Sequence, residues 1–270
     1  MDLKKEIINL YRKTAIELPG DITFALQRAK KNEDDSNSKE ILGKILENIK
    51  KAKDESKPIC QDTGIPIFYV KYPIIHSQKE LKRIIEEATT DATKEIPLRP
   101  NAVDSLTNKN IGNKPIIHFD ESENLKINLL LKGRGSENVS SIYQLPDLKI
   151  NANRNLDGVK KCVLDTTFKA QGKGCPPYII GVAIGGSIEE VAHSSKRQLL
   201  RKLDDQNPIK ELKNFEENLL NQVNQLGIGP MGLGGKTTAL SIKIESNIRH
   251  PASFFVAVSM GCWCLRRHCL

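Results

Sequence analysis

The sequence predicts a mixed α and β fold of the α+β type, a single large domain with helices around a mixed sheet. Three observations lead to this prediction. Short apolar runs rich in β-branched residues repeatedly end in loops rich in Gly, Cys, Asn and Arg. Amphipathic helical patterns separate these runs. The 270 residues hold no internal repeat, low-complexity linker or break in composition, so we expect one domain over residues 1–270.

Apolar spacing and capping signals predict the individual elements, and spacings such as Ser187 with Glu190 match a capping box. Asp157 is expected to cap its helix. The predicted helices lie at residues 3–18, 21–31, 39–53, 77–94, 157–171, from 187 onward and 209–226; the predicted strands lie at 65–72, 115–119, 125–131, 178–184, after 238 and at 253–259.

The composition limits the class of partner. Hydrophobic residues make up 39% and charged residues 27%, which are values of a folded globular protein. The net charge of +8 is compatible with nucleic acid, an anionic membrane surface or small anionic substrates, but aromatic residues are only 5% and are not interleaved with basic ones. No apolar window approaches the roughly 18 residues of a transmembrane helix, and no signal-peptide core follows the charged first residues. We therefore expect a cytoplasmic protein that binds neither nucleic acid nor membrane.

The stretch from Gly172 to Leu200 has the features of a site. Cys175 stands between glycines and two prolines, directly before an apolar strand. That strand ends at Gly185-Gly186, where a helix begins, and a glycine pair ahead of a helix N-terminus suits an anion. The same pattern is also an ordinary connection between a strand and a helix. The functional interpretation of this stretch therefore depends mainly on the Cys175 thiol.

A second motif, CQDTG, precedes the predicted strand at 65–72. An ordinary turn explains Asp62 and Gly64, but it does not explain Cys60 and Gln61 together. Four side chains that can ligate, accept or donate lie within four positions, anchored by a strand. We interpret this turn as functional.

Further motifs are rich in Arg or Gly. Arg99 lies between Pro97 and Pro100, on backbone kept out of helix, where its guanidinium can grip a carboxylate; a surface arginine is the alternative. Residues 132–138, KGRGSEN, form a loop that wraps an anion or makes a tight turn. Five glycines in residues 227–235 mark a functional loop, which is no Walker loop because a strand follows it.

The six cysteines differ in setting. Three stand at strand ends inside motifs, Cys162 falls in mid-helix as a core thiol, and Cys264 and Cys269 are ambiguous. Three dispersed thiolates can converge on one 4Fe–4S cluster and leave one iron open as a Lewis acid. The rival is a cramped local zinc site. The dispersed set is Cys60, Cys175 and Cys262; the zinc set is Cys262, Cys264, His268 and Cys269.

Together these motifs resemble the class I (iron–sulfur) fumarate hydratase family, specifically its separate α subunit, which is also the form of the L(+)-tartrate dehydratase α subunit. They follow the family's order along nearly the whole chain. They are CQDTG at 60–64, LRPNAVDSLT at 98–107, KGRGSEN at 132–138, GCPPYIIGVAIGG at 174–186, GIGPMGLGGKTTAL at 227–240 and the CW..RR ending at 262–267.

The resemblance implies a hydro-lyase that hydrates fumarate reversibly to malate. L(+)-tartrate or another 2-hydroxydicarboxylate is the alternative substrate, and a basic metal- or nucleic-acid-binding module is the non-enzyme alternative. By the resemblance, a 4Fe–4S cluster is bound by Cys60, Cys175 and Cys262, the catalytic residue is Asp62, and the substrate contacts are Gln61, Asp62, Arg99 and the backbone at Gly135.

The resemblance also implies a partner. The proposed base and further arginine and lysine contacts belong to a β subunit, so we expect half an active site here and a hetero-oligomer of the α2β2 type. Arg134 departs from the glycine that we expect of the family at this position. It leaves the identity of the dicarboxylate open.

Overall fold

The computed structural model describes residues 2–270 and confirms the α+β class, with helices and mixed sheets. The chain divides into two compact units, each assembled from separate stretches. Unit 1 comprises residues up to 19, 47–134 and 264–270; unit 2 comprises 20–46 and 135–263. The assignment of residues 1–270 to one catalytic domain stays a prediction. Within the described chain, none of the helices has the length and apolar character needed to cross a membrane.

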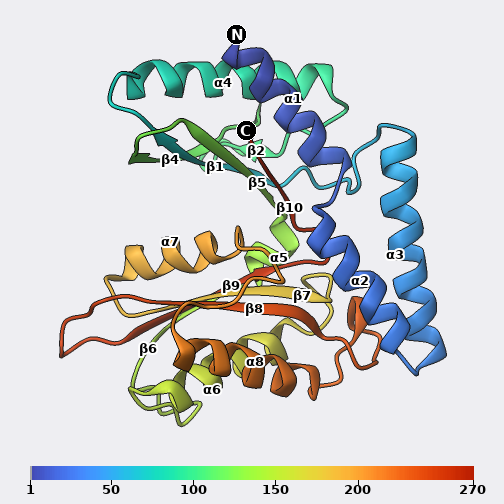
Figure 1. The fold of residues 1–270 in the computed structure, drawn as a ribbon, viewed down its shortest axis with the longest axis vertical. Coiled ribbons are helices and arrows are strands. Elements are labelled where there is room, and N and C mark those ends of the chain that lie inside the picture. The colour runs from blue at the N-terminus through green and yellow to red at the C-terminus, as the bar shows by residue number, and fades with distance from the viewer. Residues whose placement is uncertain (1) are drawn as a thin grey trace. The chain divides into compact units, whose positions relative to one another are not determined.

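Unit 1 is a four-stranded mixed sheet with two helices packed against it (Figure 1). Its elements are α1 (Leu3–Ile16), β1 (Ile65–Tyr72), α4 (Gln78–Glu95), β2 (Ala102–Val103), β3 (Asn110–Gly112), β4 (Ile116–Glu121), β5 (Lys126–Lys132) and β10 (Arg266–Cys269). The strand order is β10-β5-β1-β4, in which only the β1–β4 pair is parallel. Apolar faces of α1 and α4 bury one face of this sheet, and the rings of Tyr11 and Phe68 pack in a T-shaped arrangement.

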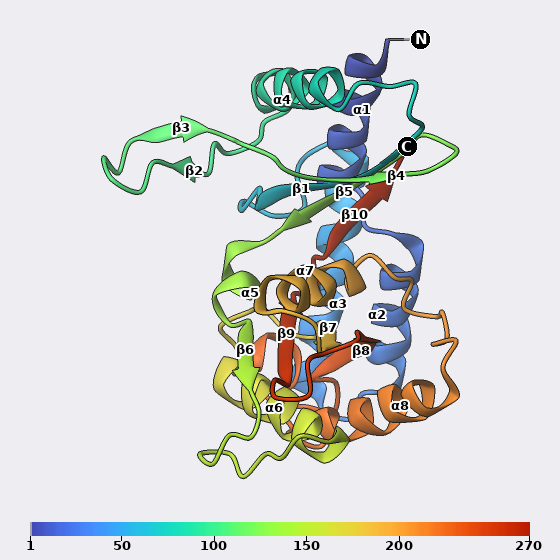
Figure 2. The same cartoon turned by 90° about the vertical axis from the view of Figure 1, so that its left-hand side faces the viewer.

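Strands β2 and β3 form a separate hairpin that reaches away from this sheet (Figure 2). Its turn is held by Asp104, whose Oδ1 accepts hydrogen bonds from the backbone N–H groups of Leu106 at 3.2 Å and Thr107 at 2.8 Å. At its base, Asn110 Nδ2 donates to the carbonyl of Pro100 at 2.7 Å. The segment that follows Arg99 is therefore ordered by its own local hydrogen bonds.

Unit 2 has a second four-stranded mixed sheet, with strand order β6-β9-β7-β8. Its elements are α2 (Gly20–Asn32), β6 (Ser141–Gln144), α6 (Leu156–Ala170), β7 (Tyr178–Ile184), α7 (Ile188–Gln198), α8 (Lys210–Asn224), η1 (Pro230–Gly232), β8 (Ala239–Ser246) and β9 (Phe255–Gly261). Two helices run across the division, α3 (Ser36–Asp54) and α5 (Arg134–Asn138). The β7–β8 pair is parallel, and β9 is antiparallel to both β6 and β7.

Helices cover both faces of the unit 2 sheet. Figure 1 shows α7 on one face and α6 with α8 on the other. The main core fills the α6–α8 side and includes Tyr178, Ile180, Val182 and Ile184 of β7, and every residue of this strand is buried. On the α7 side the packing is closest at Gly181, where an added Cβ would lie 2.1 Å from the carbonyl oxygen of Ser195. Only glycine fits there without moving the helix, so β7 is held firmly in place.

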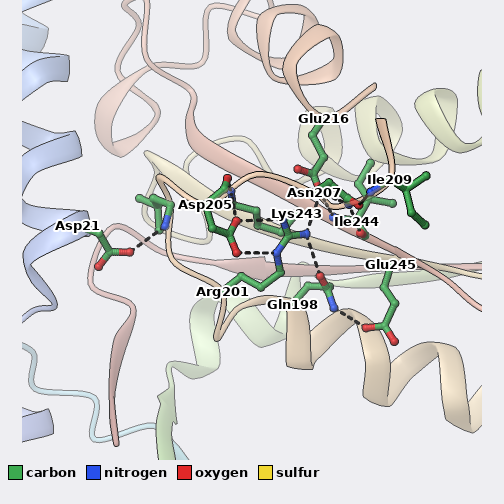
Figure 3. Close-up of polar contacts among 11 residues, drawn as sticks. Asp21, Gln198, Arg201, Asp205, Asn207, Ile209, Glu216, Lys243, Ile244 and Glu245 are labelled. Carbon is green, nitrogen blue, oxygen red and sulfur yellow. Dashed lines mark hydrogen bonds and ion pairs between the residues drawn. The ribbon is translucent and has the colours of Figure 1, made fainter. Parts of the chain in front are cut away.

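A network of charged side chains fastens the segment after α7 (Figure 3). Arg201 donates through Nε and Nη2 to the two carboxylate oxygens of Asp205, at 3.0 and 2.9 Å, and through Nη1 to Glu216 at 2.9 Å. Lys243 Nζ lies 2.7 Å from Asp205 Oδ1, and Glu216 accepts the N–H of Ile244 at 2.7 Å. Burial raises the pKa of Asp205, but the hydrogen bonds from Arg201 and Lys243 outweigh it and lower the pKa overall. The network joins α8 to β8.

The predicted elements are largely confirmed, and the strands at 65–72 and 178–184 agree in both bounds. The capping box is present: Ser187 Oγ accepts the N–H of Glu190, whose carboxylate accepts the N–H of Ser187. The prediction that Asp157 caps α6 is wrong, because Asn155 accepts the N–H of Gly158 at 2.9 Å. The pattern did not reveal β2, β3, β6 and β10, each of which has four residues or fewer.

Candidate active site

The Cys60–Gly64 turn lies in unit 1, between α3 and β1. The carboxylate of Asp62 accepts hydrogen bonds from three parts of unit 1. Oδ1 accepts hydrogen bonds from the backbone N–H of Gly64 at 2.9 Å and from Asn101 Nδ2 at 3.0 Å. Oδ2 accepts the backbone N–H of Arg134 at 2.7 Å. One side chain therefore joins the turn to the motif after Arg99 and to the end of β5.

The thiol of Cys60 is half-buried and has an acidic character. A hydrogen bond from Cys264 is the main cause that lowers its pKa. Burial opposes this effect, but the positive charge of Arg266 and a hydrogen bond with the backbone of Asp62 lower the pKa further, to about 6. A cysteine with this pKa is mostly thiolate at neutral pH, which is the form that binds a metal. Sequence reasoning left Cys264 ambiguous; the structure buries it beside Cys60.

Cys162 provides the contrast. It is fully buried in the core of unit 2, where burial raises its pKa to about 12. Such a thiol stays protonated and packs as a small apolar group. This setting agrees with the core role expected for it.

Arg266 contacts this turn from β10, a strand that the sequence pattern did not predict, although the residue belongs to the motif at 262–267. It is 1% exposed, and its Nη2 donates to the backbone carbonyl of Asp62 at 2.7 Å. On β10 it pairs with Leu131 of β5. A buried cation from the last strand thus fixes the backbone of the candidate catalytic residue.

Gln61 and Arg99 are both exposed. Arg99 lies in the irregular segment after α4, as predicted, and its backbone carbonyl accepts Asn113 Nδ2 at 3.2 Å. Asn113 Oδ1 in turn accepts the N–H of Asn101 at 2.9 Å. The asparagines fix the backbone of this motif and leave the guanidinium at the surface. Arg134, the departure from the expected pattern, is exposed and donates through Nη2 to the carbonyl of Asn101 at 3.2 Å.

In unit 2 the topology places Cys175 and Cys262 at neighbouring strand ends. Cys175 comes just before β7 and Cys262 just after β9, and these antiparallel strands are paired at Ile179 and Gly261. The N–H of Trp263 donates to the carbonyl of Cys175 at 3.1 Å. Both thiols are half-buried. Burial and then the charges of these two cysteines raise the pKa of Tyr178 to about 12. Two cysteines 87 residues apart in the sequence therefore lie beside one tyrosine.

The backbone around Cys175 is tightly constrained. Cys175 has a φ of +58°, and the Pro176-Pro177 bond is cis. The glycine loop at 227–235 packs directly on this turn: the N–H of Met231 donates to the carbonyl of Pro176 at 2.8 Å. A Cβ on Gly172 would lie 2.7 Å from the carbonyl oxygen of Met231. Two motifs that the sequence predicted separately are thus one packed structure in unit 2.

Gly135 lines a cavity of about 400 Å³ in unit 2. The predicted loop at 132–138 is instead the end of β5 followed by one turn of helix, α5. The carbonyl of Lys173 would lie 3.4 Å from a Cβ at Gly135, an approach without backbone strain. The lining consists of the residues Gly135, Asn138, Val139, Ser140, Ser141, Lys169, Ala170 and Lys173. Two lysines and two serines among them suit an anion.

The structure brings Cys60, Asp62 and Arg134 together in unit 1, and Cys175 with Cys262 in unit 2. Residues 2–270 contain no group of three or more His, Cys, Asp or Glu side chains arranged to hold a metal ion. The rival zinc set is not gathered either, because Cys264 is buried beside Cys60 whereas Cys269 is exposed. The predicted roles of the individual residues stay predictions.

Comparison with known proteins adds independent evidence. The family model described as "Fumarate hydratase (Fumerase)" matches residues 4–270. The chain is 42% identical over 276 residues to the "Putative fumarate hydratase class I" of Geobacillus stearothermophilus, covering 98% of this chain and 54% of that protein. It is 40% identical to the "Putative L(+)-tartrate dehydratase subunit alpha" of Methanocaldococcus jannaschii, over 99% of this chain and 96% of that protein. It is 32% identical to the "L(+)-tartrate dehydratase subunit alpha" of Escherichia coli K12, over 98% and 89%.

These matches indicate an enzyme of the hydro-lyase class. The chain belongs to the fumarate hydratase family, as the sequence motifs predicted. It spans about half the length of the Geobacillus stearothermophilus relative, and nearly the whole length of the relatives named as α subunits.

Proposed function

We propose that this chain is the α part of a hydro-lyase that adds water reversibly to fumarate to give malate. The observation that carries the proposal is the Cys60–Gly64 turn, in which a thiol with a lowered pKa adjoins a carboxylate held by three N–H donors. Family membership supports the reaction class.

The residues fit an iron–sulfur cluster by their donor chemistry. Cys60, Cys175 and Cys262 are half-buried thiols beside strand ends, whereas Cys162 and Cys264 are buried. Thiolates are the ligands of such clusters. A 4Fe–4S cluster held by three cysteines would leave one iron free to act as a Lewis acid on the substrate hydroxyl.

The other residues of the chain would bind and orient the substrate. Arg99 presents its planar guanidinium at the surface, where it can take a substrate carboxylate through two parallel hydrogen bonds. Asp62 has three of its lone-pair positions engaged by N–H donors, which keeps the carboxylate in one orientation. With its carboxylate held in this way, Asp62 would fix the position of Gln61 and orient the catalytic base.

The base and the clamp for the second carboxylate would come from a β subunit. Two relatives that this chain matches along most of their length are named as α subunits, which supports such a partner. The full match to these proteins also favours a second candidate substrate, L(+)-tartrate, since the chain covers 96% of the Methanocaldococcus jannaschii relative.

Anaerobic reconstitution of the purified chain, with and without a co-expressed partner, tests the proposal. We expect broad visible absorption from the cluster, turnover of malate and fumarate only with the partner, and loss of both signals in Cys175→Ser. Preference for tartrate would replace the substrate and keep the reaction class. Full activity of the chain alone would overturn the two-subunit assignment. Nucleic-acid binding that falls steeply with salt, without a cluster, would favour a basic binding module.

A further inference from the structure

Arg266 is a buried cation with unused hydrogen-bonding capacity. It is 1% exposed, yet its Nε and Nη1 atoms have no hydrogen-bond partner among residues 2–270. Removing a charged group from water is costly unless opposite charge and hydrogen bonds compensate for it. Arginines are therefore rarely left in this state without a function for the charge.

The bond that Arg266 does make is directed at the candidate site. Its Nη2 donates to the carbonyl of Asp62 at 2.7 Å, which fixes the backbone of the turn from the side of β10. On the other side, Gly64 presses against β5, where an added Cβ would lie 2.7 Å from the carbonyl oxygen of Lys132. The turn is thus held between two strands, β5 through contact and β10 through a charged hydrogen bond.

The orientation of the Asp62 carboxylate depends on this backbone. Its two oxygens accept the N–H groups of Gly64 and Arg134 as well as Asn101. If the Asp62 peptide moves, these bonds lose their geometry together, because they all originate from one residue.

We propose that Arg266 is a positioning residue that fixes the Cys60–Gly64 turn and places a compensating positive charge beside its anionic groups. The role of the turn in catalysis rests on the proposed function, but the mechanical part of the inference does not. Arg266 makes one bond to the turn through Nη2 and keeps its Nε and Nη1 donors for negative charge that arrives with the bound cofactor.

Amide hydrogen exchange of the metal-free chain, resolved at Gly64 and Arg134 by NMR, tests the mechanical part. In Arg266→Lys and Arg266→Gln we expect these two amides to exchange about ten- to a hundredfold faster, the range for losing a charge-assisted hydrogen bond. Arg266→Gln, which loses the charge as well, should show the larger effect. The β7 amides of unit 2 serve as the internal reference.

Arg267→Gln is the matched control. Arg267 is the next residue on β10, is 7% exposed, and faces the opposite side of the strand. We expect its variant to leave the Gly64 and Arg134 amides unchanged. Unchanged exchange in both Arg266 variants would overturn the proposal. So would a uniform loss of protection along β1 and β5, because that would make Arg266 an ordinary part of the core.

A second measurement addresses the charge. After incubation with ferrous iron and sulfide under anaerobic conditions, we expect the Arg266→Gln chain to bind iron about 10- to 100-fold more weakly than wild type, as the loss of an outer partner of a metal ligand does. Arg266→Lys should recover part of this affinity. Equal iron binding in all three proteins would overturn the compensating-charge role. Failure of wild type to bind iron would instead count against the proposed function, while the exchange result would stand.

Discussion

The two units present their cysteines in different ways. In unit 1, Cys60 depends on side chains: a hydrogen bond from Cys264 and the charge of Arg266 set the state of its thiol. In unit 2, Cys175 and Cys262 depend on backbone: paired strands, a residue with positive φ and backbone hydrogen bonds to the neighbouring loops fix where they lie. A side-chain arrangement tunes the charge of a ligand, whereas a backbone arrangement fixes its place. The difference predicts distinct responses to mutation.

Removal of the candidate ligands should have the largest effect. We expect Cys60→Ser, Cys175→Ser and Cys262→Ser each to lower activity of the assembled enzyme by more than about 100-fold, beyond the range seen for outer partners. Iron content and turnover are the measurements. Cys269→Ser is the matched control: Cys269 is exposed, and we expect its variant to keep the iron content and turnover of the wild type. Wild-type iron content in any one of the three variants would remove that cysteine from the ligand set.

Arg99→Lys should have the next largest effect. The change keeps the charge but loses the planar fork, so we expect kcat/KM to fall about ten- to a hundredfold, chiefly through KM. Arg134→Lys tests the neighbouring exposed arginine in the same assay. If the two variants behave alike, the assignment of the carboxylate contact to Arg99 is wrong.

Gly181→Ala tests whether the unit 2 cysteines rely on a rigid strand. The new methyl group would lie 2.1 Å from the carbonyl oxygen of Ser195, so α7 must move. We expect a loss of about 1–3 kcal/mol in the free energy of unfolding, measured in urea, with increased reactivity of Cys175 and Cys262 but not of Cys60. Gly20→Ala, where nothing lies within 4 Å, is the control. Equal stability of both variants would show that β7 tolerates displacement.

The pH dependence of Cys60 should show the smallest effect, and it isolates the side-chain arrangement. The folded pKa, about 6, lies below the ordinary value of a thiol, so the thiolate is favoured by folding. Alkylation of the metal-free chain should therefore rise through pH 6, and the stability that the thiolate contributes should be fully present above the ordinary thiol pKa of 9.0 and be lost as the pH falls from there to about 6. Cys264→Ala should move the midpoint upward. A midpoint near the ordinary thiol value in wild type would contradict the arrangement in unit 1.

Sequence patterns predicted those parts of the fold that local rules determine. The strand at 178–184 is continuously apolar and bounded by Pro and Gly, and both of its ends were placed correctly. The four residues of β10 have no such signal: they include two arginines and a histidine, and they form a strand only because β5 offers an open edge. Asp157 is of a residue type that often caps helices, but Asn155 has the extended backbone of an N-cap residue and makes the capping hydrogen bond.

The residues of the candidate site likewise differ in whether a local pattern predicts them. Motifs indicated Cys60, Asp62, Cys175 and Cys262 because several reactive side chains and turn residues occur together in the sequence. Cys264 and Arg266 act on the Cys60–Gly64 turn from about 200 residues further along the chain. No local pattern announces such a contact, which depends on the register of β10 with β5.

The position of β10 has a consequence for how the protein folds during synthesis. Its partner, β5, is made before any of residues 135–263, and β10 follows only after all of them. Until then the edge of β5 is unpaired and open to other strands, and the Asp62 carbonyl has no Arg266. The sheet of unit 2 also waits for a late strand, because β9, which lies between β6 and β7, ends at Gly261 and β10 begins at Arg266; both sheets are therefore completed only at the end of synthesis.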